Sequence, residues 1–264
     1  KVFHFNPGKF FFKPVLEKAS ISTIRIAICG GGPLAPSIFK VYQELGIDFI
    51  QGYGLTETSP IIALNPKEHF KIDSVGQYFI NYMEMRIDNP DENGIGEVQV
   101  KGPMVMQGYY KMEEETKEMF TSDGWLKTGD LGKLDFEGYL TLCGRAKNLI
   151  VTEGGKNVFP EEIENAFQLY NDIEQITVKG YIMDKETKSE GIEALIYPSE
   201  ECMKRLGAVR GDQNSADLVK ETISDIVEKV NKTLATYARI TKITILDEAL
   251  EMTTTKKVKR NYQQ

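Results

Sequence analysis

The sequence predicts a mixed fold: the end of an α/β layer, then a small β-rich, barrel-like subdomain, then a C-terminal α+β domain. Three observations support this prediction. Residues 24–50 follow a strand, helix, strand order. Residues 74–142 consist of short alternating segments separated by Gly, Asn-Gly and Asp-Gly, and residues from about 148 onward mix helical and strand periodicities. We therefore assign the chain to the α/β and α+β multidomain class.

The first elements form a β-loop-α-β unit. We expect a short buried strand over residues 24–29, a helix over 36–45 and a second strand over 47–50, with the two strands parallel. Open sheets of this kind bind ligands beyond the carboxyl ends of their strands. The first strand ends in three glycines, Gly30, Gly31 and Gly32. Alone, such a glycine run also fits a tight strand-to-helix turn.

The stretch after the second strand, Gln51-Gly52-Tyr53-Gly54-Leu55-Thr56-Glu57-Thr58, carries the side chains of a nucleotide site. Glycines 52 and 54 permit positive φ and a close approach of the backbone. Tyr53 offers a flat face for a purine, Thr56 a donor to phosphate, and Glu57 a carboxylate for Mg²⁺. Taken alone, the stretch also fits an exposed loop whose tyrosine packs on a neighbour.

The remaining elements are shorter and separated by turns. In the β-rich subdomain we expect strands near 83–87, 96–101 and 139–142 and a short helix over 113–120. In the α+β domain we expect a strand over 149–151, a turn at 153–155, a helix over 160–170, strands near 174–182 and 191–197, a polar stretch over 198–216, a helix over 216–234 and a strand over 240–246.

Composition limits the function classes. The 264 residues are 41% hydrophobic and 27% charged, which suits one large or two modest globular domains. A formal net charge of −7 argues against a dedicated nucleic-acid surface. The three cysteines, Cys29, Cys143 and Cys202, are widely spaced, which indicates neither a disulfide framework nor a paired-cysteine metal site. A cytoplasmic location is the simplest interpretation.

The sequence shows no apolar run near the ~20 residues of a membrane span. The aromatic run at residues 10–12 lies between Lys9 and Lys13, so any membrane contact is expected to be peripheral. The chain begins at Lys1 and has no signal-peptide pattern, which suggests a piece of a longer protein.

A series of motifs in fixed order resembles the adenylate-forming (AMP-binding) superfamily, which includes acyl-CoA synthetases, firefly luciferase and the adenylation domains of nonribosomal peptide synthetases. The resemblance covers the chain from about residue 21 to the end and is strongest to long-chain fatty acid-CoA ligases. Its motifs are Gly30-Gly31-Gly32-Pro33, the stretch 51–58, Gly96-Glu97-Val98, Gly124-Trp125-Leu126-Lys127-Thr128-Gly129-Asp130, Gly144-Arg145-Ala146-Lys147, and Gly154-Gly155-Lys156-Asn157-Val158-Phe159-Pro160-Glu161-Glu162-Ile163-Glu164.

The resemblance implies roles for the nucleotide-site residues. Tyr53 would stack on adenine, Thr56 would contact the adenylate phosphate, and Glu57 would bind Mg²⁺. Asp130 would accept both ribose hydroxyls, with Arg145 beside it; alone, the two also fit a turn residue and a surface ion pair. The other residues implied to bind AMP or ATP are the glycines at 30 to 32, Gln51, Gly52 and Gly54.

The resemblance also implies a mobile C-terminal domain, residues 149–264, that follows a hinge at 144–148 centred on Lys147. After rotation, Gly154 and Gly155 would line the tunnel for CoA; the pair also fits a hairpin turn. Lys257 would be the catalytic lysine that bridges the substrate carboxylate and the phosphate, together with Glu57 and Thr56. Arg260 follows it at the family's spacing, and the neighbouring lysines 256 and 259 remain alternatives.

The family's triphosphate-binding loop, rich in glycine and Ser/Thr, has no match in the sequence. We therefore expect residues 1–73 to end the large α/β subdomain, residues 74–143 to form the β-rich subdomain, and the chain to be the C-terminal half of a ligase, inactive alone. The implied whole enzyme uses ATP and Mg²⁺ to convert a fatty acid, expected to be long-chain, into acyl-AMP and then transfers the acyl group to CoA. The alternatives are an aryl or amino acid adenylation domain that loads a carrier protein, and a non-catalytic nucleotide-binding fragment.

Overall fold

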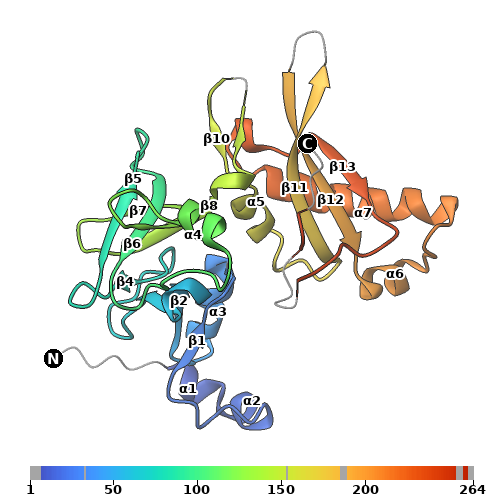
Figure 1. Cartoon of the computed structure of the whole chain (residues 1–264). Coiled ribbons are helices and arrows are strands. Elements are labelled where there is room, and N and C mark those ends of the chain that lie inside the picture. Colours follow the sequence, from blue (N-terminus) through green and yellow to red (C-terminus); the bar gives the residue numbers. More distant parts are fainter. Residues whose placement is uncertain (1–6, 33, 153, 185–188, 254–257, 261–264) are drawn as a thin grey trace. The chain divides into compact units, whose positions relative to one another are not determined.

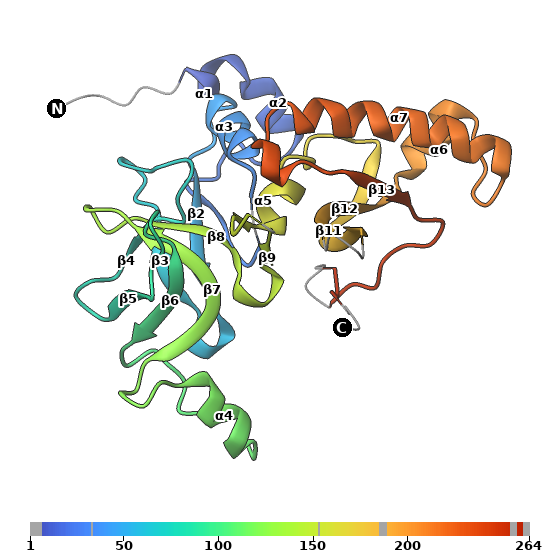
Figure 2. The same cartoon turned by 90° about the horizontal axis from the view of Figure 1, so that it is seen from above.

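The computed structural model describes residues 7–32, 34–152, 154–184, 189–253 and 258–260. The chain divides into two compact units, Lys1–Lys147 and Asn148–Gln264. Figures 1 and 2 show their elements from two directions. Each unit combines helices with sheets, so the predicted mixed fold class is confirmed.

The first unit begins with a four-stranded sheet in the order β1-β2-β3-β4. Strand β1 runs parallel to β2, as predicted, and β2, β3 and β4 pair antiparallel. Its elements are α1 (Gly8–Phe11), α2 (Lys13–Lys18), β1 (Ala27–Cys29), α3 (Pro36–Glu44), β2 (Phe49–Gly54), the 3₁₀ helix η1 (Thr56–Thr58), β3 (Ile61–Leu64) and β4 (Gln77–Tyr78). Phe39 of α3 packs with Leu16, Ile47 and Phe49 in a core of this part. This core holds α3 against the sheet.

Strand β2 runs four residues further than predicted, because β1 pairs with one of its edges and β3 with the other. The stretch 51–54 therefore lies in a strand, and the turn follows it. Neither Gly52 nor Gly54 has a positive φ, so that expectation was wrong. The close approach is confirmed at Gly54, where a Cβ atom would lie only 1.8 Å from the carbonyl oxygen of Pro60.

The β-rich part is an antiparallel sheet in the order β5-β6-β7-β8. Its elements are β5 (Glu84–Asp88), β6 (Gly96–Lys101), α4 (Glu113–Met119), β7 (Leu126–Leu134) and β8 (Leu140–Arg145). Among the described strands, β5 and β8 do not pair with each other, so the barrel-like subdomain is an open sheet. Val98, Leu126 and Leu140 pack with Tyr53 and Ile62 of the first sheet in one core. This core joins the two sheets of the unit.

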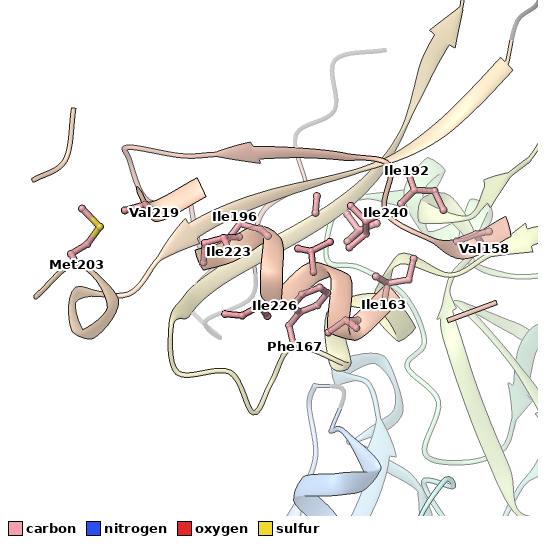
Figure 3. Close-up of a cluster of buried hydrophobic side chains, with 14 residues drawn as sticks. Val158, Ile163, Phe167, Ile192, Ile196, Met203, Val219, Ile223, Ile226 and Ile240 are labelled. Atoms are coloured by element: carbon pink, nitrogen blue, oxygen red, sulfur yellow. The ribbon is translucent and has the colours of Figure 1, made fainter. Parts of the chain in front are cut away.

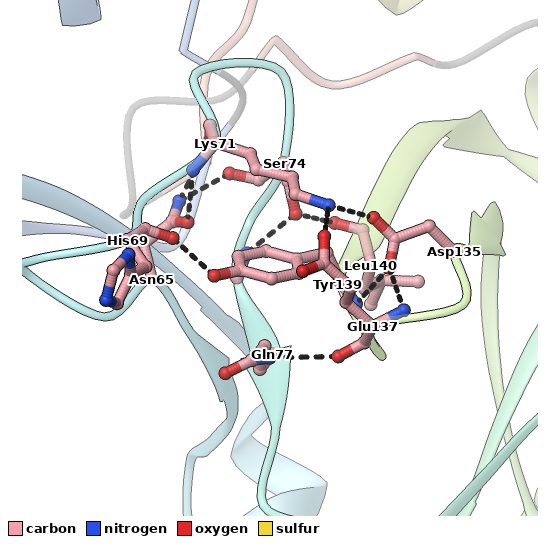
Figure 4. A network of polar contacts seen from close by, with 10 residues as sticks. Asn65, His69, Lys71, Ser74, Gln77, Asp135, Glu137, Tyr139 and Leu140 are labelled. Atoms are coloured by element: carbon pink, nitrogen blue, oxygen red, sulfur yellow. Dashed lines mark hydrogen bonds and ion pairs between the residues drawn. The ribbon is translucent and has the colours of Figure 1, made fainter.

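A polar network fastens the loop between β3 and β4 to the turn between β7 and β8 (Figure 4). Lys71 Nζ lies 2.5 Å from both Asp135 Oδ2 and Glu137 Oε2. The Tyr139 hydroxyl donates to the carbonyl of His69. Backbone hydrogen bonds between residues 75–76 and Leu140 also join the two segments. The two sheets are therefore held together by hydrogen bonds as well as by the shared core.

The second unit contains a three-stranded sheet in the order β11-β12-β13 with helices packed against it. The 3₁₀ helix η2 (Ala146–Asn148) spans the division between the units. The elements of the second unit are β9 (Ile150–Val151), β10 (Asn157–Val158), α5 (Pro160–Asn165), β11 (Ile173–Asp184), β12 (Ser189–Pro198), α6 (Glu200–Leu206), α7 (Gln213–Asn231), the 3₁₀ helix η3 (Thr236–Ala238) and β13 (Lys242–Ile245). Ile223 and Ile226 of α7 share a buried cluster with Ile196 of β12 and Ile163 of α5 (Figure 3). This cluster forms the unit's core.

Three helices of this unit differ from the prediction. Helix α7 begins and ends three residues earlier than the predicted span 216–234. Helix α5 ends at Asn165, five residues before the predicted end at 170. The polar stretch 198–216 contains α6, which was not predicted. Its signals were nevertheless present: the Ser199 hydroxyl accepts from Cys202 N, and Gly207 ends the helix with a φ of 62°. Helix α6 was not predicted because its sequence contains few apolar residues.

The described helices include none with the length and apolarity needed to cross a bilayer.

Candidate active site

Asp130 lies at the centre of a buried polar constellation in the first unit. It occupies β7, opposite Arg145 of β8 in the strand register. Arg145 Nε lies 2.7 Å from Asp130 Oδ1, and the Tyr53 hydroxyl donates to Asp130 Oδ2 at 2.5 Å. Asp130 and Tyr53 are each only 8% exposed. Three strands, β2, β7 and β8, therefore bring together the residues predicted to contact the adenine and the ribose.

Local backbone geometry explains how β7 presents this aspartate. Gly129 has a φ of 70°, a left-handed conformation that favours glycine, and its N–H donates to Glu97 Oε1 at 3.2 Å. The Thr128 hydroxyl donates to the carbonyl of Val98 at 2.7 Å and accepts from the Asp130 N–H at 3.1 Å. The pairing with β6 shifts register across this stretch, and the pairing with β8 shifts just after it, between Leu131 and Gly132. Thr128-Gly129-Asp130 is therefore an irregular strand segment, not a free turn.

Burial sets the protonation of this group. It raises the pKa of Tyr53 well above its ordinary value, and the adjacent Asp130 carboxylate raises it further. Tyr53 therefore remains a hydrogen-bond donor at neutral pH. A carboxylate has about four acceptor positions, and Tyr53 and Arg145 account for one on each oxygen. These two contacts hold the carboxylate in place through both of its oxygens.

Glu57 lies in η1, on the turn that follows β2. Thr58 is buried and shapes this turn: its hydroxyl donates to the carbonyl of Pro60 at 2.7 Å and accepts from the Leu55 N–H at 3.0 Å. Glu57 is half-buried, and Oε1 accepts a 2.7 Å hydrogen bond from the hydroxyl of Tyr109. This bond raises the pKa of Tyr109 to about 12. Thr56, beside it, is exposed.

The Glu57 carboxylate fits a Mg²⁺ ion that is shared with a nucleotide. The described part of the chain contains no group of three or more His, Cys, Asp or Glu side chains that could hold a metal ion. Mg²⁺ commonly uses one or two carboxylates and takes its other ligands from water and substrate phosphates. The hydrogen bond from Tyr109 occupies Oε1 of Glu57. Oε2 can therefore serve as a single protein ligand.

The glycine turn lies at the same end of the sheet. Cys29, the last residue of β1, is opposite Gln51 of β2, so the glycine turn begins beside residues 52–54 of β2. A Cβ atom on Gly30 would lie 3.2 Å from the Gly52 carbonyl oxygen, whereas one on Gly31 would meet open space. Gly31 needs its freedom for a φ of 82°. Gln51 is buried within the sheet.

The other predicted residues belong to the second unit or to its start. Lys147 lies in η2, at the last residue of the first unit. Gly154 and Gly155 lie in the turn between β9 and β10, where Gly155 has a φ of 71°, so the hairpin is confirmed. Lys257 and its neighbour Lys256 lie outside the described residues. Lys259 is exposed, with Nζ 3.5 Å from Glu251.

Sequence reasoning missed two groups of residues that contact the predicted ones. Tyr109 is 52 positions from Glu57, and no local pattern connects them. In the second unit, Arg260 pairs with Glu161 and Glu164 of α5. The three-residue spacing of these glutamates places them on one helix face and was an available signal.

Comparison with known proteins shows which family the chain resembles. A family model described as AMP-binding enzyme matches residues 7–110, which include the glycine turn, Tyr53 and Glu57. The resemblance to adenylate-forming enzymes is confirmed. The long-chain-fatty-acid–CoA ligase FadD15 of Mycobacterium bovis is 36% identical over an alignment of 259 residues; the match covers 93% of this chain and 41% of that protein. The 2-succinylbenzoate–CoA ligase of Oceanobacillus iheyensis is 42% identical over 159 residues, 59% of this chain and 33% of that protein.

A solved structure extends the similarity to the fold. The o-succinylbenzoate CoA synthetase of Bacillus subtilis, in complex with the acyl-adenylate intermediate OSB-AMP, matches with a TM-score of 0.73 and 29% identity. The match covers 96% of this chain and 49% of that one. The same enzyme in complex with ATP and magnesium ion matches with a TM-score of 0.71 and 29% identity, over 96% and 49% of the chains. The chain thus spans less than half the length of these relatives.

Proposed function

We propose that this chain is the C-terminal part of an AMP-forming acid–thiol ligase. The observation that carries the proposal is the constellation in which Tyr53 and Arg145 each contact the buried carboxylate of Asp130. It occurs in a chain that resembles CoA ligases over 93% of its length. In the proposed reaction, a carboxylic acid and ATP give acyl-AMP and pyrophosphate. The thiol of CoA then replaces AMP, which forms the acyl thioester and releases a proton.

Asp130 is the proposed ribose-binding residue. Tyr53 and Arg145 each hold one of its oxygens, and a carboxylate suits a ribose because its two oxygens can accept from two vicinal hydroxyls. A carboxylate fixed by two protein donors loses little conformational freedom when a ligand binds. The Tyr53 ring is proposed to contact adenine, and the backbone of residues 30–32 to lie along the acyl-adenylate.

Glu57 and Thr56 are the proposed residues at the phosphates. When bound, Mg²⁺ would supply positive charge that lets the carboxylate substrate approach the α-phosphate. Glu57 would hold it through the oxygen that Tyr109 leaves available. Thr56 is exposed beside it and can donate its hydroxyl to a phosphate oxygen.

The second unit is the proposed mobile domain. Lys147 stands where the two compact units divide, which is the position expected of a hinge. We propose that Lys257 serves the adenylation step. Gly154 and Gly155 serve the CoA step after the domain rotates: a Cβ atom on either glycine would meet open space, so their surface can admit a narrow group.

A long-chain fatty acid is the proposed substrate, because FadD15 resembles nearly the whole chain. An aryl acid is the second candidate, favoured by the 42% identity to a 2-succinylbenzoate–CoA ligase over a shorter stretch. We place the enzyme in the cytoplasm. Phe10 and Phe11 are largely exposed and could contact a membrane peripherally.

The test is acid-dependent AMP and thioester formation by the full-length protein that contains this chain. Palmitate, 2-succinylbenzoate and ferulate are each supplied with ATP, Mg²⁺ and CoA, and the thioester products are identified by mass spectrometry. The proposal predicts palmitoyl-CoA and AMP in equal amounts, with little product from the aryl acids. Preference for an aryl acid would move the substrate assignment, and ADP in place of AMP would contradict the reaction type.

A further inference from the structure

A buried charged cluster in the second unit plays no part in the proposed chemistry. Arg260 Nη2 lies 2.6 Å from Glu164 Oε2 and 3.5 Å from Glu161 Oε1. The side chains of the three residues are only 13 to 18% exposed. The two glutamates come from α5, and the arginine comes from the last described residues of the chain.

The carboxylates are held from several sides. Glu164 Oε1 accepts from the Val178 N–H of β11 at 2.7 Å, and Thr177 also donates to Glu164. Asn148 Nδ2 donates to Glu161 Oε1 at 2.5 Å. These contacts fix α5, β11 and the start of the second unit around one point. Arg260 connects the C-terminal segment to the same two carboxylates.

The cluster is electrostatically unbalanced. Two carboxylates face one guanidinium, and within the described residues Glu161 Oε2 and Arg260 Nη1 are buried without a hydrogen-bond partner. Burial raises the pKa of Glu164 to about 7, while the charge of Arg260 acts in the opposite direction. Buried ion pairs seldom stabilise a fold more than well-packed apolar groups would. Their planar, directional contacts do fix the orientation of the segment that carries the arginine.

The same segment flanks Lys257. Met252 and Val258 form an antiparallel bridge, and the Lys259 N–H donates to the Glu251 carbonyl at 2.7 Å. The described residues on both sides of 254–257 are therefore held next to each other. Arg260 lies two residues after the bridge and connects the bridged residues to α5.

We propose that Arg260, held by Glu164 and Glu161, is a positioning residue that anchors the C-terminal segment for the adenylation step. The inference rests on the proposed function of Lys257, three residues before Arg260. Loss of the anchor leaves the lysine present but releases the described residues 258–260 that follow it. Adenylation then slows, whereas thioester formation, which does not use this lysine, continues.

The anchor itself is tested without activity, by hydrogen exchange of the 264-residue chain. Arg260→Gln and Glu164→Gln are expected to speed exchange of the amides at 258–260 by about tenfold or more, because local opening becomes easier. Glu251→Gln is the matched control: it breaks the exposed pair with Lys259 on the same segment and should change this exchange less than about twofold. Arg260→Lys, which keeps the charge but not the planar fork, should lie between wild type and Arg260→Gln. Unchanged exchange in Arg260→Gln would overturn the anchor.

The positioning role is tested by separating the half-reactions in the full-length protein. Arg260→Gln is expected to lower the rate of acyl-AMP formation by about 10- to 100-fold, because misplacement of a reacting group has costs of that order. Thioester formation from supplied acyl-AMP should stay within about twofold of wild type, and Arg260→Lys should recover part of the adenylation rate. Equal loss in both half-reactions, or no loss, would overturn the inference. If the wild type forms no acyl-AMP, the proposed function is rejected. The hydrogen-exchange experiment then still tests whether Arg260 anchors the segment.

Discussion

Replacing Tyr53 with Phe should weaken the first unit while leaving its core filled. The substitution removes only the hydroxyl that donates to Asp130 Oδ2 at 2.5 Å, and both residues are 8% exposed. A hydrogen bond to a charged group contributes about 1.5–3 kcal/mol, and the carboxylate oxygen left behind is buried. Arg145 remains on the other oxygen, so we expect the unfolding free energy to fall by about 2 kcal/mol.

Trp125 makes this change measurable in the first unit alone. It is the only tryptophan of the chain and precedes β7, with the Arg86 guanidinium 4.4 Å from its ring centroid. Urea unfolding followed by its fluorescence should show the midpoint of Tyr53→Phe lowered by about 1 M, for a slope of about 2 kcal/mol per M.

An exposed tyrosine provides the matched control. Tyr110 is 86% exposed, so Tyr110→Phe should shift the stability by less than about 0.5 kcal/mol. A double-mutant cycle with Asp130→Asn should give a coupling energy near the loss caused by Tyr53→Phe. Equal midpoints for Tyr53→Phe and Tyr110→Phe would refute the view that the hydroxyl holds Asp130 in place.

Four further outcomes are expected. Gly54→Ala should prevent folding of the first unit, seen as lost Trp125 fluorescence change in urea, because the new Cβ would lie 1.8 Å from a backbone oxygen. The pKa of Glu164 is raised from 4.5 to about 7, so the folded state binds an extra proton between these pH values. The unfolding free energy of the wild type should therefore fall by about 3 kcal/mol relative to that of Glu164→Gln as the pH rises from 4.5 to above 7. Equal pH slopes in unfolding experiments would contradict this. Lys257→Ala in the full-length protein should abolish adenylation but not thioester formation from acyl-AMP, and parallel loss of both would reject its role. Gly154→Leu should do the reverse, and it is preferable to a change at Gly155 because that glycine has a φ of 71°; an intact CoA step would remove the tunnel assignment.

The elements predicted correctly are those whose signals are local. The order strand, helix, strand of the first sheet was predicted correctly because apolar runs, Pro36 at the start of α3 and Gly46 after its end lie within a few residues. The predicted burial of the first strand was wrong, since Ile28 of β1 is exposed. Strand β7 was missed because Gly129 and Gly132 interrupt its pattern, and only pairing with β6 and β8 makes it a strand.

The site shows the same division between local and distant information. The stretch 51–58 and the Asp130 motif could be recognised from their own residues. Their mutual contacts could not, because Tyr53 and Asp130 are 77 positions apart and Arg260 and Glu164 are 96 positions apart. Such contacts depend on how strands pair and how the chain end returns, which no short sequence pattern encodes.

The central claim is that this chain is one part of a ligase that activates a carboxylic acid with ATP. Pyrophosphate release with palmitate, ATP and Mg²⁺ tests it most directly, measured in parallel for the full-length protein and the 264-residue chain. We predict palmitate-dependent release by the full-length protein, its loss in Asp130→Ala, and no turnover by the 264-residue chain. Robust release by the 264-residue chain would contradict its assignment as an incomplete part, and a full-length protein without palmitate-dependent or other acid-dependent release would contradict the ligase assignment itself.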